Sequence, residues 1–176
     1  MQRIVLAGGC FWCLEAVFLR VRGVLRVESG YANGHLDAPS YEAVCGGQTG
    51  HAEVVALEFD PGVLSLDEVL SVFFAMHDPT TLNRQGNDVG TQYRSGIYTS
   101  DEAQTQAVQR FMAALPRDPH WAGTQVVTEV QPLQAYWPAE AYHQRYYEAH
   151  PQQGYCAYII APKVQKLMRD YQRYLA

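Results

Sequence analysis

A cysteine follows two glycines near the start of the chain, in the stretch GGCFWC of residues 8–13. A short apolar run precedes this stretch and an amphipathic pattern follows it, so we expect a strand, a glycine turn and a helix. That order places Cys10 at a helix N-terminus, where free backbone N–H groups and the helix dipole favour a thiolate. The large aromatic residues Phe11 and Trp12 come directly after the thiol. They indicate a cysteine at the floor of an apolar pocket.

The helix terminus alone makes Cys10 only modestly acidic. It stabilises an anion by about 0.3–1 kcal/mol, whereas a shift of one pKa unit requires about 1.4 kcal/mol. A thiol with an ordinary pKa of about 8.5 then stays mostly protonated at neutral pH. Such a thiol becomes useful when the site also activates its target. The alternative is a small buried hydrophobic residue, and the glycine turn and helix start argue against it.

A second stretch, residues 41–55, holds a candidate proton donor. Glu53 begins an apolar strand, and burial there would raise its pKa and keep the carboxyl protonated. A protonated carboxyl beside a thiol is a proton donor. An exposed carboxylate at the strand entrance fits the sequence equally well. In the same stretch, His51 either orders the loop or acts as a ligand, and Cys45 is most simply a packing residue.

A third stretch, residues 86–95, combines a tyrosine with charged side chains just before a strand. Tyr93 and Arg94 stand where side chains can point into a cleft. A tyrosine hydroxyl can hydrogen-bond an acceptor oxygen without adding charge. Alternatively, Tyr93 packs on the sheet and Asp88 caps a turn.

The C-terminal part of the chain holds an aromatic cluster and a further thiol. In a predicted helix, His143, Tyr146 and Tyr147 fall on one side at i, i+3 and i+4, and such a stripe is usually core. Cys156 follows this helix, just after Gly154, in a segment that could move. A second thiol would need to stand there if it had to reach Cys10.

The elements that must position these residues alternate between strands and helices. The sequence predicts strands at 3–7, 24–31, 54–59, 95–99 and 125–130, and helices at 11–21, 65–77, 100–115, 138–150 and 162–174. Ser65 and Glu68 form a capping box, Ser100 caps the third helix, and Pro138 stands in the first turn of the fourth. The loops 32–52 and 78–94 are long, which favours a functional role.

This order predicts an α+β fold over a single catalytic domain, residues 1–176. We expect a two-layer ferredoxin-like sandwich of the split βαβ type, with a mixed sheet, helices on one face, long active-site loops and a C-terminal extension.

The bulk composition excludes several classes of function. The chain has 48% hydrophobic and 18% charged residues, a net charge of −5 and no basic stripe for nucleic acid. Its apolar runs are too short to span a membrane, and no signal peptide is visible at the N-terminus. Four cysteines in a chain of this length do not make a disulfide framework, so we expect a cytoplasmic protein.

Together, four separated stretches resemble the signature motifs of the A-type peptide methionine sulfoxide reductases. They are residues 9–12, 50–55, 90–95 and 139–144, in the right order, and the similarity covers most of the chain. The resemblance implies that Cys10 attacks the sulfoxide sulfur. Glu53 would protonate or hydrogen-bond the sulfoxide oxygen, assisted by Tyr41 and Tyr93. Phe11 and Trp12 would hold the substrate methyl group, with Asp88 and His143 in the surrounding polar network.

The resemblance also implies how the enzyme is recycled. Attack releases methionine and leaves a sulfenic acid on Cys10, which condenses with Cys156 to a disulfide that thioredoxin reduces. The substrates would be oxidised proteins or free methionine sulfoxide, as the S epimer at sulfur. No cofactor or metal is implied, nor a nucleic acid or membrane partner, and we expect a monomer.

The chain departs from the commonest family pattern at Cys13, where a glycine usually follows the tryptophan. Cys10 and Cys13 form a C-x-x-C at a helix start, a spacing that can close a disulfide. Cys156 is therefore the first candidate for the resolving cysteine and Cys13 the second. The alternative for Cys13 is a thiol on the helix face with no part in turnover.

Two other functions fit parts of the sequence. A glutaredoxin-like thiol–disulfide oxidoreductase would use Cys10 and Cys13, but it needs a proline loop for which only Pro132 is available, and it gives Glu53 and Tyr93 no role. A non-catalytic zinc module would use Cys10, Cys13, Cys45 and His51. It would leave the two aromatic residues after Cys10 without a purpose.

Overall fold

A six-stranded mixed sheet forms the centre of the computed structural model, which describes residues 1–176. In spatial order its strands are β7 (Glu129–Pro132), β6 (Ser95–Thr99), β1 (Gln2–Gly8), β3 (Ala52–Phe59), β2 (Val24–Ala32) and β8 (Tyr136–Pro138). All neighbours are antiparallel except β6 and β7, which are parallel. The expected α+β class and mixed sheet are confirmed.

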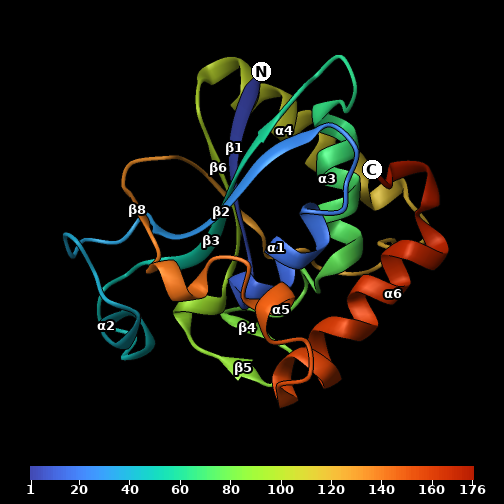
Figure 1. Ribbon diagram of the computed structural model, residues 1–176. Helices are drawn as coiled ribbons and strands as arrows, with labels where there is room; N and C mark the ends of the chain where they lie inside the picture. The colour runs from blue at the N-terminus through green and yellow to red at the C-terminus, as the bar shows by residue number, and fades with distance from the viewer.

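Helices cover one face of this sheet. Figure 1 shows α1, α3 and α6 on the same side of the strands, with α2 and β8 towards the opposite edge of the view. The helices are α1 (Phe11–Phe18), α2 (Tyr41–Cys45), α3 (Leu66–Met76), α4 (Glu102–Ala114), α5 (Tyr146–Ala149) and α6 (Ala161–Asp170). A π-helical turn, Cys156–Ile160, leads into α6, and a small hairpin pairs β4 (Arg84–Gln85) with β5 (Asp88–Val89).

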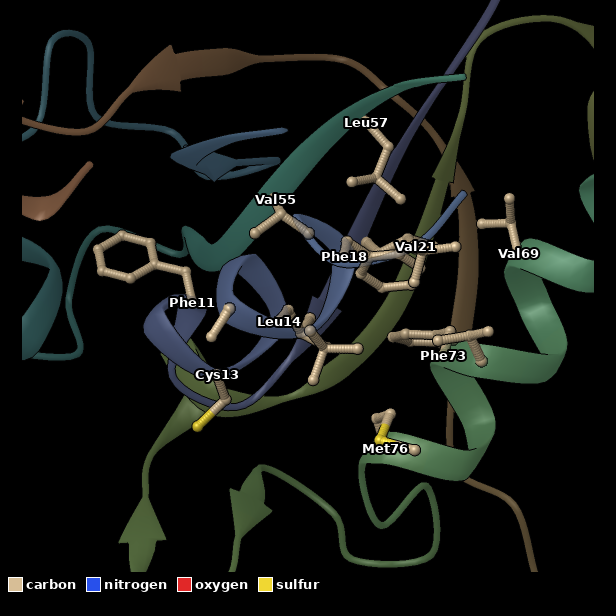
Figure 2. Close-up of a cluster of buried hydrophobic side chains, with 14 of the residues drawn as sticks. Phe11, Cys13, Leu14, Phe18, Val21, Val55, Leu57, Val69, Phe73 and Met76 are labelled. Carbon is tan, nitrogen blue, oxygen red and sulfur yellow. The ribbon is translucent and has the colours of Figure 1, made fainter. Parts of the chain in front are cut away.

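The main core lies between the sheet and helices α1 and α3. Figure 2 shows Leu14, Phe18 and Val21 facing Val69 and Phe73 of α3. All five side chains are buried, and so are the inward residues of β1 and β3. A smaller cluster covers the other face of the sheet, and its members are Val5, Ala7, Ala32, Ala52, Val54, Ala56 and Tyr98.

Phe18 is expected to be a main contributor to stability. Its ring is fully buried in the larger cluster, so Phe18→Ala removes apolar contacts and leaves a cavity. We expect a loss of about 3–5 kcal/mol in the free energy of unfolding, measured by urea titration. Leu25, which is 60% exposed, is a matched control, and Leu25→Ala should change the free energy little. Equal losses for both variants would contradict this view of the core.

The turn between β1 and α1 forms as the sequence indicates. Gly9 has a φ of 88°, and a Cβ on it would come within 2.6 Å of the Gln85 side chain, so only glycine fits there. Cys10 is the N-cap of α1. The helix ends at Phe18 rather than at residue 21 because the following residues bind the chain end. Arg22 N–H donates to the Tyr174 carbonyl, and Val21 forms a bridge with Leu175.

The two long loops expected from the sequence contain regular structure, and the N-cap of α4 is a different residue from the one expected. Ser40 accepts a hydrogen bond from the Ala43 N–H and starts α2 within the loop 32–52, while the β4–β5 hairpin lies within 78–94. The expected capping box of Ser65 and Glu68 is present. The cap of α4 is Asp101, because the Ser100 hydroxyl donates to the Arg3 carbonyl.

The predicted helix 138–150 is wrong. Pro138 ends strand β8 instead, and residues 141–143 form a single 3-10 turn. The Gln144 side chain pairs with both backbone groups of Ser29, and Arg145 adopts a left-handed conformation with φ of 54°. The helix therefore shrinks to α5. The predicted helix 162–174 is present as α6, but it ends at Asp170 and a 3-10 turn, Gln172–Tyr174, follows it.

None of the helices combines the length and the apolar character needed to cross a bilayer.

Candidate active site

Cys10 lies at the start of α1 with only 9% of its surface exposed. Burial raises the pKa of its thiol well above the ordinary value, and a hydrogen bond with Cys13 and the charge of Glu53 act in the same direction. The expectation of a slightly acidic thiol is therefore wrong for the free protein. Removal from water outweighs the helix terminus, because the dipole effect is small compared with the desolvation of an anion.

Glu53 is buried beside this thiol, with 1% of its surface exposed. Its Oε1 accepts a hydrogen bond of 3.2 Å from the backbone N–H of Phe11, the residue next to Cys10. Its Oε2 has no partner. Burial raises the pKa of Glu53 to about 8, so the carboxyl is mostly protonated at neutral pH. The alternative of an exposed carboxylate is wrong, and the side chain can donate a proton near Cys10.

Tyr41 and Tyr93 both lie close to Glu53. Burial raises the pKa of each hydroxyl, and the charge of Glu53 contributes in both cases, so both are neutral donors. The Tyr41 ring stands 6.4 Å from Phe11 and 4.4 Å from His143. The structure thus brings these residues together from three distant parts of the chain.

Glu140 fixes the backbone of α2 and a tyrosine on the sheet. Its Oε2 accepts from the Tyr41 N–H at 3.0 Å, and its Oε1 accepts from the Tyr31 hydroxyl at 2.8 Å. The sequence places Glu140 in the signature stretch 139–144 but does not indicate a role for it. Its position shows that it sets where Tyr41 stands relative to Glu53.

An aromatic wall stands over the start of α1. The Trp12 ring stacks on Tyr146 with centroids 3.8 Å apart and planes 7° apart. Its Nε1–H donates to Nδ1 of His143 at 3.1 Å, and the Phe11 ring lies 5.1 Å from the same imidazole. His143 is buried, and burial lowers its pKa, which favours the neutral ring that this acceptor role requires.

The other thiols lie further along α1 and in the C-terminal segment. The Cys13 sulfur is 3.7 Å from the Tyr155 hydroxyl, which itself donates to Asp88 Oδ2 at 2.6 Å. Cys156 is completely buried. Cys45 is exposed, so the expectation that it is a packing residue is wrong.

The four residues of the zinc alternative do not converge. His51 Nδ1 accepts from the Gly34 N–H at 3.0 Å, and its Nε2 is 2.7 Å from the Leu36 carbonyl. The imidazole therefore orders the loop and has no nitrogen left for a metal. No three His, Cys, Asp or Glu side chains of the chain are grouped so that they could hold a metal ion. The zinc module is accordingly wrong.

Comparison with known proteins places this chain in a family. The family model described as Peptide methionine sulfoxide reductase matches residues 2–175. The chain belongs to this family. It is 54% identical over 172 residues to the peptide methionine sulfoxide reductase MsrA of Acinetobacter baumannii (strain SDF). The aligned residues cover 98% of this chain and 97% of the relative.

Solved structures of the same family are also similar. Mxr1 from Saccharomyces cerevisiae in reduced form aligns with a TM-score of 0.80 and 38% identity, over 88% of each chain. The structure of Mxr1 in complex with Trx2 aligns with a TM-score of 0.56 and 26% identity, over 82% of this chain and 84% of the other. The glutaredoxin-like alternative is therefore wrong, although its C-x-x-C is present.

Two further aromatic residues of this reductase contact the site through α1. Tyr146 is the stacking partner of Trp12, and Tyr155 joins Cys13 to Asp88. The chain contains 12 tyrosines, and nothing in the local sequence distinguishes these two. Only their contacts with α1, more than a hundred residues earlier, reveal them.

Proposed function

We propose that this protein reduces the S epimer of methionine sulfoxide, free or within oxidised proteins, to methionine. The observation that carries the proposal is the Glu53 carboxyl, buried and bonded to the Phe11 N–H beside the Cys10 thiol. Burial raises its pKa to about 8, which favours the protonated acid at neutral pH. A sulfoxide sulfur is a poor electrophile until its oxygen is protonated or strongly hydrogen-bonded. The site supplies a neutral acid and a thiol in one water-poor place, where hydrogen bonds to a developing charge are strongest.

In the first step, the Cys10 sulfur attacks the sulfoxide sulfur while Glu53 donates a hydrogen bond or proton to its oxygen. Tyr41 and Tyr93 assist with neutral hydroxyl donors. The oxygen is transferred to Cys10, which becomes a sulfenic acid as its sulfur loses two electrons, and the substrate sulfur gains them and leaves as methionine. The raised pKa of Cys10 is compatible with this step, because Glu53 makes the sulfoxide sulfur more electrophilic.

The aromatic wall would hold the substrate methyl group. Phe11 and Trp12 offer apolar surfaces to a methyl and a polarisable sulfur, contacts that sulfur makes favourably with aromatic rings. His143 holds the Trp12 indole and Asp88 holds Tyr155, so both act in the surrounding polar network.

A disulfide and thioredoxin would complete the cycle. We propose Cys156 as the resolving cysteine and Cys13 as the second candidate, with no cofactor or metal. The structure of Mxr1 bound to Trx2 supports thioredoxin as the reductant.

The proposal also covers the type of fold, the cellular location and the oligomeric state. The order β6-β1-β3-β2, with α1 after β1 and α3 after β3, supports the split βαβ description of the core. Four cysteines without a disulfide support a cytoplasmic location. We also propose that the protein acts as a monomer.

The proposed substrate is tested with the separated epimers. Each is incubated with the protein, thioredoxin and its reductase, and methionine is measured by amino-acid chromatography. We expect methionine from the S epimer and only background from the R epimer. Equal consumption of both would disprove the stereochemical assignment, and consumption of neither would disprove the function.

Trp12→Ala should weaken substrate binding more than it affects the thiol. The change removes the ring that stacks on Tyr146, so the methyl group loses one wall of its pocket. We expect a rise in KM of about two- to tenfold, since a lost aromatic contact is worth about 0.5–1.5 kcal/mol. Alkylation of Cys10 by iodoacetamide should change by less than about threefold.

The matched control for this prediction is Trp121→Ala, a partly buried tryptophan that packs on Phe74. It should leave KM unchanged. A Trp12 variant with normal KM would contradict the proposed pocket.

A further inference from the structure

We propose that Glu15 is a positioning residue of the substrate pocket, whose carboxylate holds the first turn of α5 and thereby keeps the Tyr146 ring stacked on Trp12. This inference rests on the proposed function and gives a buried acid a part in shaping the aromatic wall. Glu15 is the only charged residue of α1, a helix whose other residues are apolar. Its carboxyl takes no part in the chemistry described above.

The Glu15 side chain is buried although it carries an acid. Only 1% of its surface is exposed, and neither carboxyl oxygen completes a hydrogen bond. Burial raises the pKa of Glu15 to about 7, and the charge of Glu148 acts in the same direction. The backbone N–H groups of Arg145 and Tyr146 lie close enough to favour the charged form of Glu15. These two groups are therefore the partners that the carboxylate faces.

Both N–H groups belong to the start of α5. Arg145 is the N-cap, in a left-handed conformation that is uncommon for residues other than glycine, and Tyr146 is the first helical residue. The first N–H groups of a helix have no acceptor within the helix, and a negative charge beside them is stabilising. α5 has only four residues, too few to form a stable helix without tertiary contacts. A carboxylate beside its first turn thus fixes where that turn lies.

Glu15 and Trp12 lie on the same side of α1. They are three residues apart, so their side chains are neighbours on the helix surface. Glu15 faces the backbone of Tyr146, and Trp12 stacks on its ring with centroids 3.8 Å apart. Tyr146 is consequently held at two points by α1. Loss of the carboxylate leaves the position of the ring to the stacking contact alone.

A second contact ties α5 to α1 but lies further from the aromatic wall. Glu148 pairs with Arg20 at 2.6 Å, and the two side chains are 30% and 29% exposed. Such a pair contributes little to stability, because water and salt screen it. It therefore provides a matched comparison from the same interface.

The test measures methionine released in a single turnover at increasing concentrations of the S epimer of methionine sulfoxide, without reductant. Glu15→Leu keeps a side chain of similar size and removes both acceptor oxygens. We expect the half-saturating concentration to rise about two- to fivefold, the effect of losing a negative charge at a helix N-terminus. The limiting rate should change by less than about twofold, because the groups that touch the reacting atoms remain. An unchanged half-saturating concentration would overturn the proposal.

Two further variants sharpen the result. Glu15→Gln keeps one acceptor oxygen but places an NH₂ donor opposite the two N–H groups, so its half-saturating concentration should lie between those of the unmodified protein and Glu15→Leu. If Glu15→Leu fails to fold, a folded Glu15→Gln with no rise would overturn the proposal. Glu148→Gln removes the ion pair with Arg20 and should behave as the unmodified protein. An equal rise in Glu148→Gln would show that the ion pair holds the wall, and Glu15 would not be the positioning residue.

A spectroscopic measurement separates positioning from a general loss of stability. The chain has three tryptophans, so replacing Trp121 and Trp137 by phenylalanine leaves Trp12 as the single fluorophore of this kind. Acrylamide should quench its fluorescence more strongly in Glu15→Leu, because the Tyr146 ring then covers the indole less. The free energy of unfolding should not fall, since burying a carboxylate is itself costly.

The outcomes distinguish this inference from the proposed function. Equal quenching in both proteins, or a fall in stability together with the limiting rate, would mean that Glu15 does not position the wall. Absence of methionine with the unmodified protein would instead overturn the proposed function.

Discussion

Replacing Cys10 by serine is expected to reduce methionine release to background, even in a single turnover without reductant. The sulfur at this position is both the atom that attacks and the atom that takes up the oxygen. A hydroxyl lacks the nucleophilicity for the first role and cannot form a sulfenic acid for the second. The variant should fold, because it changes one atom at a helix N-cap, and serine is itself favoured at that position.

The measurement is methionine released by a stoichiometric amount of protein, quantified by chromatography. The control is Cys45→Ser, which also removes one thiol but from the surface. It should release methionine normally. Release by Cys10→Ser comparable to that of the control would mean that another group attacks the sulfoxide, and the site described above would be wrong.

Glu53→Gln is expected to slow the first turnover by about 10²- to 10⁴-fold, the range that a positioned general acid contributes. Glutamine has nearly the same shape and can still accept from the Phe11 N–H. It has no acidic proton to give to the sulfoxide oxygen, so the substrate sulfur stays a poor electrophile. Alkylation of Cys10 should be unchanged or faster, because the charge of Glu53 is one cause of the raised pKa of that thiol.

The pH dependence gives an independent check. Burial raises the pKa of Glu53 to about 8, so the active, protonated form predominates below that pH and is lost above it. The single-turnover rate should therefore lose this contribution as pH rises through about 8. In Glu53→Gln this decline should disappear.

The matched control is Glu58→Gln, on the same strand but near its far end, where Glu58 pairs with Arg3 across to β1. It should keep both the rate and the pH profile of the unmodified protein. Equal rates for the Glu53 and Glu58 variants would show that the buried carboxyl does not take part in catalysis.

Elements that are stabilised by contacts between neighbouring residues could be predicted from the sequence. The glycine turn before α1 depends on Gly9, and the start of α3 depends on the reciprocal hydrogen bonds of Ser65 and Glu68, which are three residues apart. The inner strands are short apolar runs between turn residues. Such signals need no knowledge of the rest of the chain, because the residues that satisfy each other are neighbours.

Elements whose form depends on contacts between residues far apart in the sequence could not be predicted. The helical pattern of residues 138–150 is broken because the Gln144 side chain binds the backbone of Ser29, 115 residues away. Tyr146 and Tyr155 matter through α1, at the other end of the sequence. Local sequence patterns do not indicate which distant residues will be in contact.

For the site, too, the sequence indicates the residue types but not how deeply their side chains are buried. The sequence points to Cys10 and Glu53 as partners, but it leaves the burial of Glu53 open and gives the wrong direction for the acidity of Cys10. Both pKa values depend on how completely water is excluded, and that is a property of the assembled core. Residue types indicate which chemistry is available, and packing determines in which protonation state it begins.

The segment from Gln144 to the last residue, Ala176, is attached at both of its ends. Gln144 binds the backbone of Ser29. The last residues bind the turn after α1, where the Arg22 N–H donates to the Tyr174 carbonyl and the Ala176 N–H donates to the Arg20 carbonyl. Cys156 therefore belongs to a closed loop and not to a free tail. A thiol confined in this way keeps a high effective concentration near α1, so it can return after each encounter with a reductant at little entropic cost.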